Sequence, residues 1–326
     1  MKPGELMAAE MAEQPAVLAR LIANAGDDAA AVRKVTPVPL AGTALVARGS
    51  SDNAAVFGRY LAESVTGRPA GLAAPSLYTR YHVKVDWSNY LVIALSQSGA
   101  TPEILTTCAA MRAAGARVVG MTNEPRSPMA DAVDVTLCTN AGPERAVPAT
   151  KTMTAQMLLL ATAFEVPGMD GLPETVSDIL ADPAPADELA SRWQSIDRLV
   201  IAGRGLAYAA ALEIALKIKE TTGILAEGLS AADLRHGPIA TAFAGAPVLL
   251  IDAGGPAASD VSSLGELLAA RDATPITLPP TRPGLSEPAQ AIAAVVRGQQ
   301  LARALALAKG ADPDAPAELT KITPTT

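Results

Sequence analysis

Three times along the chain, a short apolar run ends in a glycine-containing turn and continues into a helical pattern. The first has an expected strand at 43–47, the turn RGSS at 48–51 and a helix at 52–65. The second has a strand at 90–95, the turn SQSG at 96–99 and a helix at 101–114. The third, RLVIAGRGLAYAAALEIALKIKE, begins at Arg198. Strands that alternate with helices predict parallel sheets in an α/β protein.

The third run restarts the pattern of the first, which predicts two similar halves rather than a short-period solenoid. A chain of 326 residues is long enough for two such domains. Each should be a doubly wound parallel sheet flanked by helices, a flavodoxin-like three-layer sandwich. We expect a Pro-, Asp- and Gly-rich linker between them. The expected parts are an N-terminal helical segment at 1–34, a first domain at 35–167, the linker at 168–190, a second domain at 191–310 and a tail at 311–326.

Composition narrows the function classes. The chain is 49% hydrophobic but only 3% aromatic, so its core must consist of Ala, Val, Leu and Ile. A net charge of −7 argues against nucleic acid or an anionic membrane as a partner. Cys108 and Cys138 form neither a disulfide framework nor a zinc motif. With no membrane-spanning run and no signal peptide, the expected location is the cytoplasm.

The turn at 96–99 is the first candidate site. Ser96, Gln97, Ser98 and Thr101 bring three hydroxyls, an amide side chain and free backbone N–H groups to a helix N-terminus, where a phosphate is favoured. The alternative is an ordinary strand-to-helix turn with a serine cap. No P-loop lysine and no complete dinucleotide fingerprint occur, so a nucleoside triphosphate and a nicotinamide cofactor are both disfavoured. We expect no metal and no organic cofactor.

The second candidate lies between Lys217 and Pro238. Lys217 and Glu220 share one face of an expected helix, and His236 follows in a loop before Gly-Pro. A carboxylate, an ammonium and an imidazole are the parts of an acid/base site if the fold makes them converge. Alternatively, Lys217 and Glu220 form a solvated helix pair and His236 is structural. By position alone, Lys321 belongs to a frayed tail.

Seven segments along the chain match one known family in its order. They are EQP (13–15), ARGSS (47–51), LSQSGATPEIL (95–105), TNAGPERAVPATKTMTAQ (139–156), AGRG (202–205), ALEIALKIKETTGILAEGLSAADLRHGPIA (211–240) and ALAKGADPDAPAELTKITPT (306–325). On these segments the chain resembles the sugar isomerase (SIS) family, and within it the double-SIS isomerase half of glucosamine-6-phosphate synthase. Two tandem SIS domains and a sugar-phosphate substrate are implied.

The resemblance also implies which residues bind the substrate. Those that would hold the phosphate, together with one whose backbone approaches the sugar, are Ser50, Ser51, Ser96, Gln97, Ser98, Thr101 and Val147. The chain departs from the synthase at Ala149, where the family has a hydroxyl residue, in a loop that Pro148 stiffens, and at Arg48, which replaces a small residue. These departures concern the identity of the sugar and not its phosphate.

Four further residues receive catalytic roles from the resemblance. Glu220 would move a proton between C1 and C2 of the open-chain sugar, with Lys217 assisting at the oxygen or amino end. His236 matches the ring-opening histidine, which in the family serves the neighbouring subunit's site, so a homodimer is implied. Lys321 matches the tail lysine that reaches the substrate carbonyl, which revises the interpretation of a frayed tail.

The expected activity follows from where the sequence starts. It begins at the isomerase half, without the glutaminase domain that supplies ammonia to the synthase, so we expect glucosamine-6-phosphate deaminase activity that yields fructose 6-phosphate and ammonia. The alternatives are another amino-sugar-phosphate isomerase or deglycase, or a protein like glutamine–fructose-6-phosphate transaminase without its glutaminase. A non-catalytic sugar-phosphate sensor is the alternative from another class; it would lack Glu220 and His236, and both are present.

Overall fold

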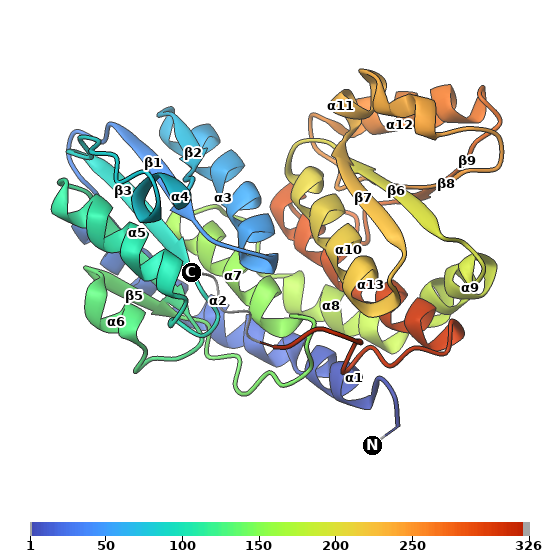
Figure 1. Cartoon of the computed structure of the whole chain (residues 1–326), viewed down its shortest axis with the longest axis horizontal. Coiled ribbons are helices and arrows are strands. Elements are labelled where there is room, and N and C mark those ends of the chain that lie inside the picture. The colour runs from blue at the N-terminus through green and yellow to red at the C-terminus, as the bar shows by residue number, and fades with distance from the viewer. Residues whose placement is uncertain (1, 322–326) are drawn as a thin grey trace. The chain divides into compact units, whose positions relative to one another are not determined.

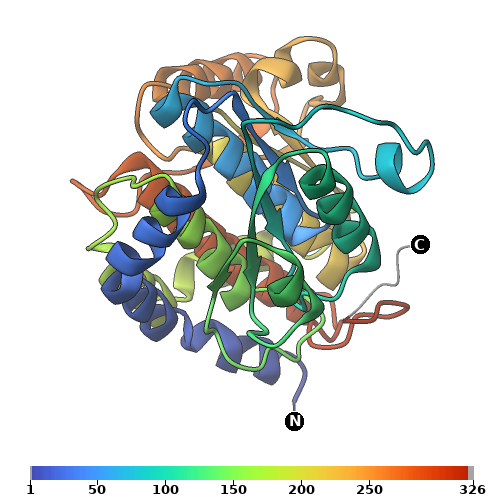
Figure 2. The same cartoon turned by 90° about the vertical axis from the view of Figure 1, so that its left-hand side faces the viewer.

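Both expected sheets are present in the computed structural model, which describes residues 2–321 (Figures 1 and 2). Residues 17–143 and 155–167 form one compact unit, which we call the first-sheet unit. Residues 2–16, 144–154 and 168–321 form the other, the second-sheet unit. Helices α2 (Gln14–Val35) and α7 (Lys151–Ala163) contribute residues to both units.

The first-sheet unit holds five parallel strands in the order β2-β1-β3-β4-β5. The strands are β1 (Gly42–Val46), β2 (Ala70–Leu72), β3 (Tyr90–Leu95), β4 (Arg117–Thr122) and β5 (Val135–Cys138). The helices between them are α3 (Ser50–Thr66), α4 (Ser76–Thr79), α5 (Pro102–Ala113) and α6 (Pro128–Ala132). Since consecutive strands run parallel, the chain must return to the same edge of the sheet after each strand, and a helix makes each of these connections.

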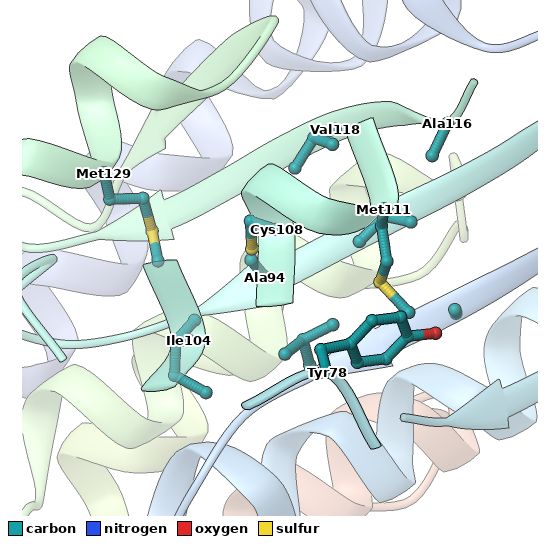
Figure 3. Packing of buried hydrophobic residues seen from close by; sticks show 11 residues of the cluster. Tyr78, Ala94, Ile104, Cys108, Met111, Ala116, Val118 and Met129 are labelled. Atoms are coloured by element: carbon teal, nitrogen blue, oxygen red, sulfur yellow. The ribbon is translucent and has the colours of Figure 1, made fainter. Parts of the chain in front are cut away.

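Alternating side chains of the first sheet pack against helices on both faces. Val92 and Ala94 of β3 join a buried cluster with Ile104, Cys108 and Met111 of α5 (Figure 3). On the opposite face α3 and α7 approach closely, because a Cβ at Gly58 would lie 2.7 Å from Leu45 and 2.8 Å from Leu160. The unit is therefore a three-layer sandwich, as predicted. Burial raises the pKa of Cys108 to about 12, so its thiol stays protonated and is no nucleophile.

The second-sheet unit holds four parallel strands in the order β7-β6-β8-β9. The strands are β6 (Arg198–Gly203), β7 (Leu225–Ser230), β8 (Pro247–Ile251) and β9 (Thr274–Leu278). The helices are α1 (Glu5–Ala12), α8 (Leu172–Ala181), α9 (Ala184–Trp193), α10 (Leu206–Thr222), α11 (Ala231–Arg235), the 3-10 turn η1 (Pro238–Thr241), α12 (Ala258–Ala269) and α13 (Glu287–Ala308). Val248 and Leu250 pack with Leu264 of α12 on one face. Helix α10 packs on the strands and against α13, where a Cβ at Gly298 would lie 2.2 Å from Ile214.

The two halves repeat one another with a constant offset. Helices α3 and α10 both have 17 residues, α5 and α12 both have 12, and each pair is 156 residues apart (206 minus 50, and 258 minus 102). Gly49 and Gly205 precede α3 and α10 with nearly equal backbone angles, φ 59°, ψ −135° and φ 61°, ψ −130°. The offset therefore allows a residue-by-residue comparison of the two halves.

Three local features differ from or add to the expectations. The stretch 168–190, expected as a linker, contains α8 and most of α9, because Pro173 and Pro185 lie in the first turns of these helices, where proline is tolerated. Within the expected N-terminal helical segment, Pro15 lies in the first turn of α2, which extends over 22 residues. Helix α3 begins at Ser50, with Gly49 as its N-cap, two residues before the expected start at 52.

Candidate active site

The turn between β3 and α5 has a geometry that only glycine permits at its end. Gly99 has φ +60°, and a Cβ there would lie 2.1 Å from the hydroxyl oxygen of Ser127. Its N–H donates to the carbonyl oxygen of Ser96 at 3.1 Å. The carbonyl oxygen of Gln97 accepts hydrogen bonds from the N–H of Asn123 at 3.0 Å and the hydroxyl of Thr122 at 3.2 Å. The turn is therefore attached firmly to the end of β4.

The predicted hydroxyls of this turn lie at the start of α5. The hydroxyl oxygens of Ser96 and Thr101 are 3.0 Å apart, and the Ser98 hydroxyl accepts from the N–H of Ala100 at 3.3 Å. Ser96 is buried, whereas Gln97, Ser98 and Thr101 are half-buried. Thr101 is the N-cap, but within the described chain no side chain caps the first turn of α5. The first N–H groups of a helix have no partner inside it, so this turn offers donors to an anion.

Ser50 and Ser51 occupy the first turn of α3, at the end of the neighbouring strand β1. Because β1 and β3 are paired and parallel, α3 and α5 begin at the same edge of the sheet. Arg48, one of the departures from the synthase pattern, joins the two starts through an ion pair of 3.0 Å with Glu103. The first-sheet unit thus brings the predicted phosphate-binding hydroxyls to one sheet edge.

The corresponding edge of the second sheet carries a carboxylate of its own. Applying the offset of 156 residues, Ser50 and Ser51 correspond to Leu206 and Ala207. The N–H of Leu206 donates to the carboxylate of Glu287, and a Cβ at Gly255 would lie 2.1 Å from an oxygen of the same carboxylate. Helix N-termini favour negative charge, so the Glu287 carboxylate lies where the start of α10 could otherwise bind an anion. The start of α10 therefore differs from the start of α3, which has Ser50 and Ser51 at the corresponding positions.

Lys217 lies in a buried row of charges on α10. Its side chain is 1% exposed, and its ammonium contacts the carboxylates of Glu213, four residues earlier, at 3.6 Å and of Glu220, three residues later. Burial alone would lower the pKa of Lys217, but the two carboxylates outweigh it and raise that pKa. The lysine therefore stays protonated. Glu213 is fully buried, whereas the Glu220 side chain is 24% exposed and so is the member of the row open to solvent.

The first half of the chain has apolar residues where the two most buried of these charges lie. By the offset, Glu213 corresponds to Phe57 and Lys217 to Leu61, both of which are buried. An ion pair in the interior must overcome the desolvation of both groups, so apolar side chains would serve packing at least as well. Helix α10 thus has buried charged residues at positions where the equivalent helix α3 has buried apolar residues. This contrast marks Glu213, Lys217 and Glu220 as a functional-site candidate.

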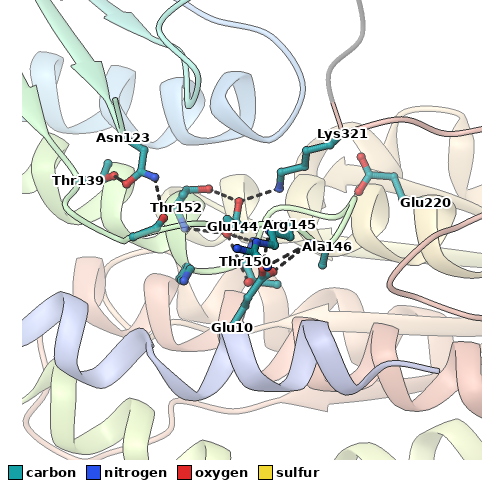
Figure 4. Close-up of polar contacts among 12 residues, drawn as sticks. Glu10, Asn123, Thr139, Glu144, Arg145, Ala146, Thr150, Thr152, Glu220 and Lys321 are labelled. Carbon is teal, nitrogen blue, oxygen red and sulfur yellow. Dashed lines mark hydrogen bonds and ion pairs between the residues drawn. The ribbon is translucent and has the colours of Figure 1, made fainter. Parts of the chain in front are cut away.

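A second charged group surrounds Glu144, in the loop before α7 (Figure 4). The ammonium of Lys321 donates to the Glu144 carboxylate at 2.9 Å, and the carboxylate is fully buried. It also accepts hydrogen bonds from the N–H groups of Thr150 at 2.9 Å and Thr152 at 3.1 Å. Burial would raise the pKa of Glu144, but the charge of Lys321 and hydrogen bonds from the Thr152 hydroxyl, the Lys321 ammonium and the Thr150 N–H lower it. Glu144 also helps to raise the pKa of Lys217, so the two charged groups interact.

The tail before Lys321 is attached to the second-sheet unit rather than frayed. The N–H of Val147 donates to the carbonyl oxygen of Asp314 at 3.0 Å. The carboxylate of Asp314 accepts from the N–H groups of Leu6 at 3.0 Å and Met7 at 2.7 Å. Val147, which the resemblance assigned to the sugar, therefore lies in a loop that also guides the tail.

His236 lies at the C-terminal end of α11 and is exposed. Its backbone N–H donates to the carbonyl oxygen of Asp233 at 2.9 Å, and Gly237 follows with φ +121°. A histidine in this place is open to a molecule outside its own chain. Its predicted role at a partner subunit's site stays a prediction.

Sequence reasoning missed three buried carboxylates of the second-sheet unit: Glu10, Glu144 and Glu213. The spacing of Glu213, four residues before Lys217, was an available signal. Glu144 lies three residues before Val147, in a segment that was already singled out. Across residues 2–321 no cluster of three His, Cys, Asp or Glu side chains could hold a metal ion. No described helix is both long and apolar enough to cross a membrane.

Comparison with known proteins gives the family. The SIS domain pattern matches residues 43–166 and 194–279, which is more than half of the chain. This chain belongs to the SIS domain family. A structure described as a phosphosugar isomerase from Silicibacter pomeroyi is 31% identical, with a TM-score of 0.87 over 94% of this chain and 99% of that one. The resemblance stated from the sequence and the α/β fold are thereby confirmed.

Relatives also include isomerizing glutamine–fructose-6-phosphate aminotransferases. That of Gloeobacter violaceus is 33% identical over 85% of this chain and 51% of its own length. That of Pyrobaculum aerophilum is 33% identical over 97% of this chain and 56% of its own length. The chain thus spans about half the length of these curated relatives. The C-terminal domain of the Francisella tularensis enzyme, at 22% identity and a TM-score of 0.83 over 96% of this chain and 98% of that one, shares the fold.

Proposed function

We propose that this SIS-family protein is a phosphosugar isomerase that acts on glucosamine 6-phosphate and releases fructose 6-phosphate and ammonia. The observation that carries the proposal is the charged row of α10, where the partly exposed carboxylate of Glu220 lies against the buried, protonated Lys217. An isomerase needs a placed carboxylate that removes a proton from one carbon and returns it to the next. The names of the relatives, phosphosugar isomerase and isomerizing aminotransferase, support a phosphorylated amino sugar.

The residues divide the work as follows. The hydroxyls of Ser96, Ser98 and Thr101 and the free N–H groups at the start of α5 bind the phosphate. Glu220 takes the proton from C2 of the open-chain sugar while Lys321 donates one to the C1 oxygen. Glu220 then returns its proton to C1, and Lys321 recovers one from the nitrogen, which leaves a C2 imine. Water adds to this imine, ammonia leaves, and C2 becomes the ketone of fructose 6-phosphate. Lys217 holds Glu220 in place through their ion pair.

We propose the direction of ammonia release because it requires fewer substrates than the reverse reaction. Release of ammonia requires only the amino sugar phosphate and water, whereas synthesis requires a source of nitrogen. The purified protein with glucosamine 6-phosphate should therefore produce ammonia and fructose 6-phosphate in equal amounts. Galactosamine 6-phosphate and glucose 6-phosphate serve as comparison substrates. Interconversion of glucose and fructose 6-phosphates without ammonia release would instead make the protein a plain aldose–ketose isomerase, and binding without turnover would make it a sensor.

We further propose a homodimer in which His236 acts at the partner subunit's site, where it moves a proton to the ring oxygen during ring opening. Its exposure at the end of α11 supports this arrangement. With both cysteines free and a phosphorylated substrate, the proposed compartment is the cytoplasm.

The proposed sharing of His236 predicts complementation between two inactive variants. Heterodimers of a His236→Ala chain and a Glu220→Gln chain contain one site with both groups intact, so they should recover roughly half of the wild-type activity under two-fold symmetry. Differently tagged chains, co-expressed and purified through both tags, allow this measurement. If His236 served its own chain's Glu220, neither site of the heterodimer would be intact and the activity would stay at the level of the two parents.

A further inference from the structure

Glu144 is a buried carboxylate whose two oxygens serve different partners. One oxygen accepts hydrogen bonds from the N–H groups of Thr150 and Thr152, which shape the turn into α7. The other accepts from the Thr152 hydroxyl at 2.7 Å and from the ammonium of Lys321 at 2.9 Å. The hydrogen bonds from the two N–H groups stabilise the loop, whereas the bond from Lys321 connects Glu144 to a residue 177 positions away in the chain. A neutral acceptor, such as an amide oxygen, could accept the same hydrogen bonds from the turn. The turn therefore does not explain why residue 144 carries a charge.

The chain on both sides of residues 317–320 is attached to the second-sheet unit. Residues 312–314 are held by backbone N–H groups at the start of α1 and by the N–H of Val147. Beyond them, residues 317–320 are exposed. Lys321 then returns to the body of the second-sheet unit, where its side chain is 23% exposed and its ammonium contacts Glu144. This ion pair attaches the tail lysine to the loop before α7.

Glu10 provides a natural comparison on the same loop. It is buried in α1, and its carboxylate accepts hydrogen bonds from the N–H groups of Arg145 and Ala146. Burial raises the pKa of Glu10, and the charge of Glu144 raises it further, against a smaller lowering by the charge of Lys321. No hydrogen bond or ion pair joins the side chains of Glu10 and Lys321 in the described chain. Glu10 therefore supports the loop without holding the tail.

We propose that Glu144 is a positioning residue that docks the C-terminal tail through Lys321 and keeps the lysine ammonium at the charged region of α10. Glu144 interacts electrostatically with Lys217, so an ammonium held against Glu144 lies in the same charged environment as the row that ends in Glu220. A salt bridge to a buried carboxylate also fixes the position of the ammonium and restricts the rotamers of the lysine, which the proton donation to the C1 oxygen requires. The catalytic part of this inference rests on the proposed function.

The docking itself is tested without any substrate. Brief acetylation followed by peptide mapping measures the reactivity of Lys321 relative to Lys34, an exposed lysine of α2. Glu144→Gln keeps an amide oxygen for the threonine N–H groups but loses the charge, so Lys321 should become several-fold more reactive. Glu10→Gln is the matched control and should leave the reactivity unchanged. Equal reactivity of Lys321 in the wild type and in Glu144→Gln would overturn the proposal.

A double-mutant cycle at Glu144 and Lys321 tests the catalytic consequence. Glu144→Gln should lower kcat for ammonia release by about 10- to 100-fold with a smaller change in KM, as expected of groups that orient a catalytic side chain. Lys321→Met should lower kcat at least as much, and the two changes together should be no worse than Lys321→Met alone. Additive losses would show that Glu144 does not act through Lys321. If even the wild type releases no ammonia, the proposed function fails while the acetylation result still decides the docking.

A variant of Lys321 covers the case in which Glu144→Gln does not fold. Lys321→Met would leave a buried carboxylate without its cation, so it should lower the melting temperature, whereas Lys321→Arg retains the ion pair and should not. Equal melting temperatures of the methionine variant and the wild type would contradict the docking role.

Discussion

Replacing Glu220 by glutamine should lower kcat for ammonia release from glucosamine 6-phosphate by about a thousandfold, the scale of a lost general acid/base. Glutamine has nearly the same shape but cannot take the proton from C2. Glu220 is 24% exposed, and Lys217 keeps Glu213 as a partner, so the fold should be unaffected. Melting temperatures measured beside the kinetics verify this point.

Isotope exchange makes the test specific for the proton-transfer step. In deuterated water, the wild type should incorporate deuterium at the carbon next to the carbonyl, and Glu220→Gln should not. Glu227→Gln, which removes an exposed carboxylate from β7 of the same unit, is the control and should behave as the wild type. Equal turnover by Glu220→Gln and the wild type would falsify the role assigned to Glu220.

A protein in which Glu213 and Lys217 are both replaced by leucine should fold at least as stably as the wild type but lose its activity. The first half of the chain already packs Phe57 and Leu61 at the corresponding positions of α3. Replacing a buried ion pair by apolar residues of similar volume is typically neutral or stabilising by about 1–4 kcal/mol. Denaturant unfolding and the ammonia assay measure the two outcomes. Retained activity would mean that the ionic row only packs α10.

The single change Lys217→Leu should behave differently. It leaves the fully buried Glu213 beside an apolar side chain, and breaking a buried pair in this way costs about 3–5 kcal/mol. Lys219→Leu, on the exposed side of the same helix, should change neither stability nor activity appreciably. Equal stability of the Lys217→Leu variant and the wild type would contradict the inferred burial of this charge.

Several carboxylates escaped the sequence-based predictions because burial is not a local property. A glutamate four residues before a lysine, such as Glu213 before Lys217, also occurs on solvent-facing helix surfaces, so this spacing does not predict burial. Glu213 is buried because α10 packs against α13, where Gly298 allows a close approach to Ile214. Glu144 and Lys321 are 177 residues apart, and no spacing rule connects them. The helices of 168–190 were missed for another reason, since proline marks both loops and first turns of helices.

The sequence by itself determined the two parallel sheets, the family and the glycine turn at 96–99. These follow from short-range patterns: apolar runs of strand length, and a position such as Gly99 where only glycine has the required backbone freedom. Only the tertiary structure decided which charges are buried and paired. The sequence predicted a surface pair of Lys217 and Glu220, whereas the structure shows that Lys217 is buried and pairs with Glu213 as well. The structure also shows that Lys321 pairs with Glu144. The physical reason is that desolvation and charge pairing depend on all the segments packed around a group.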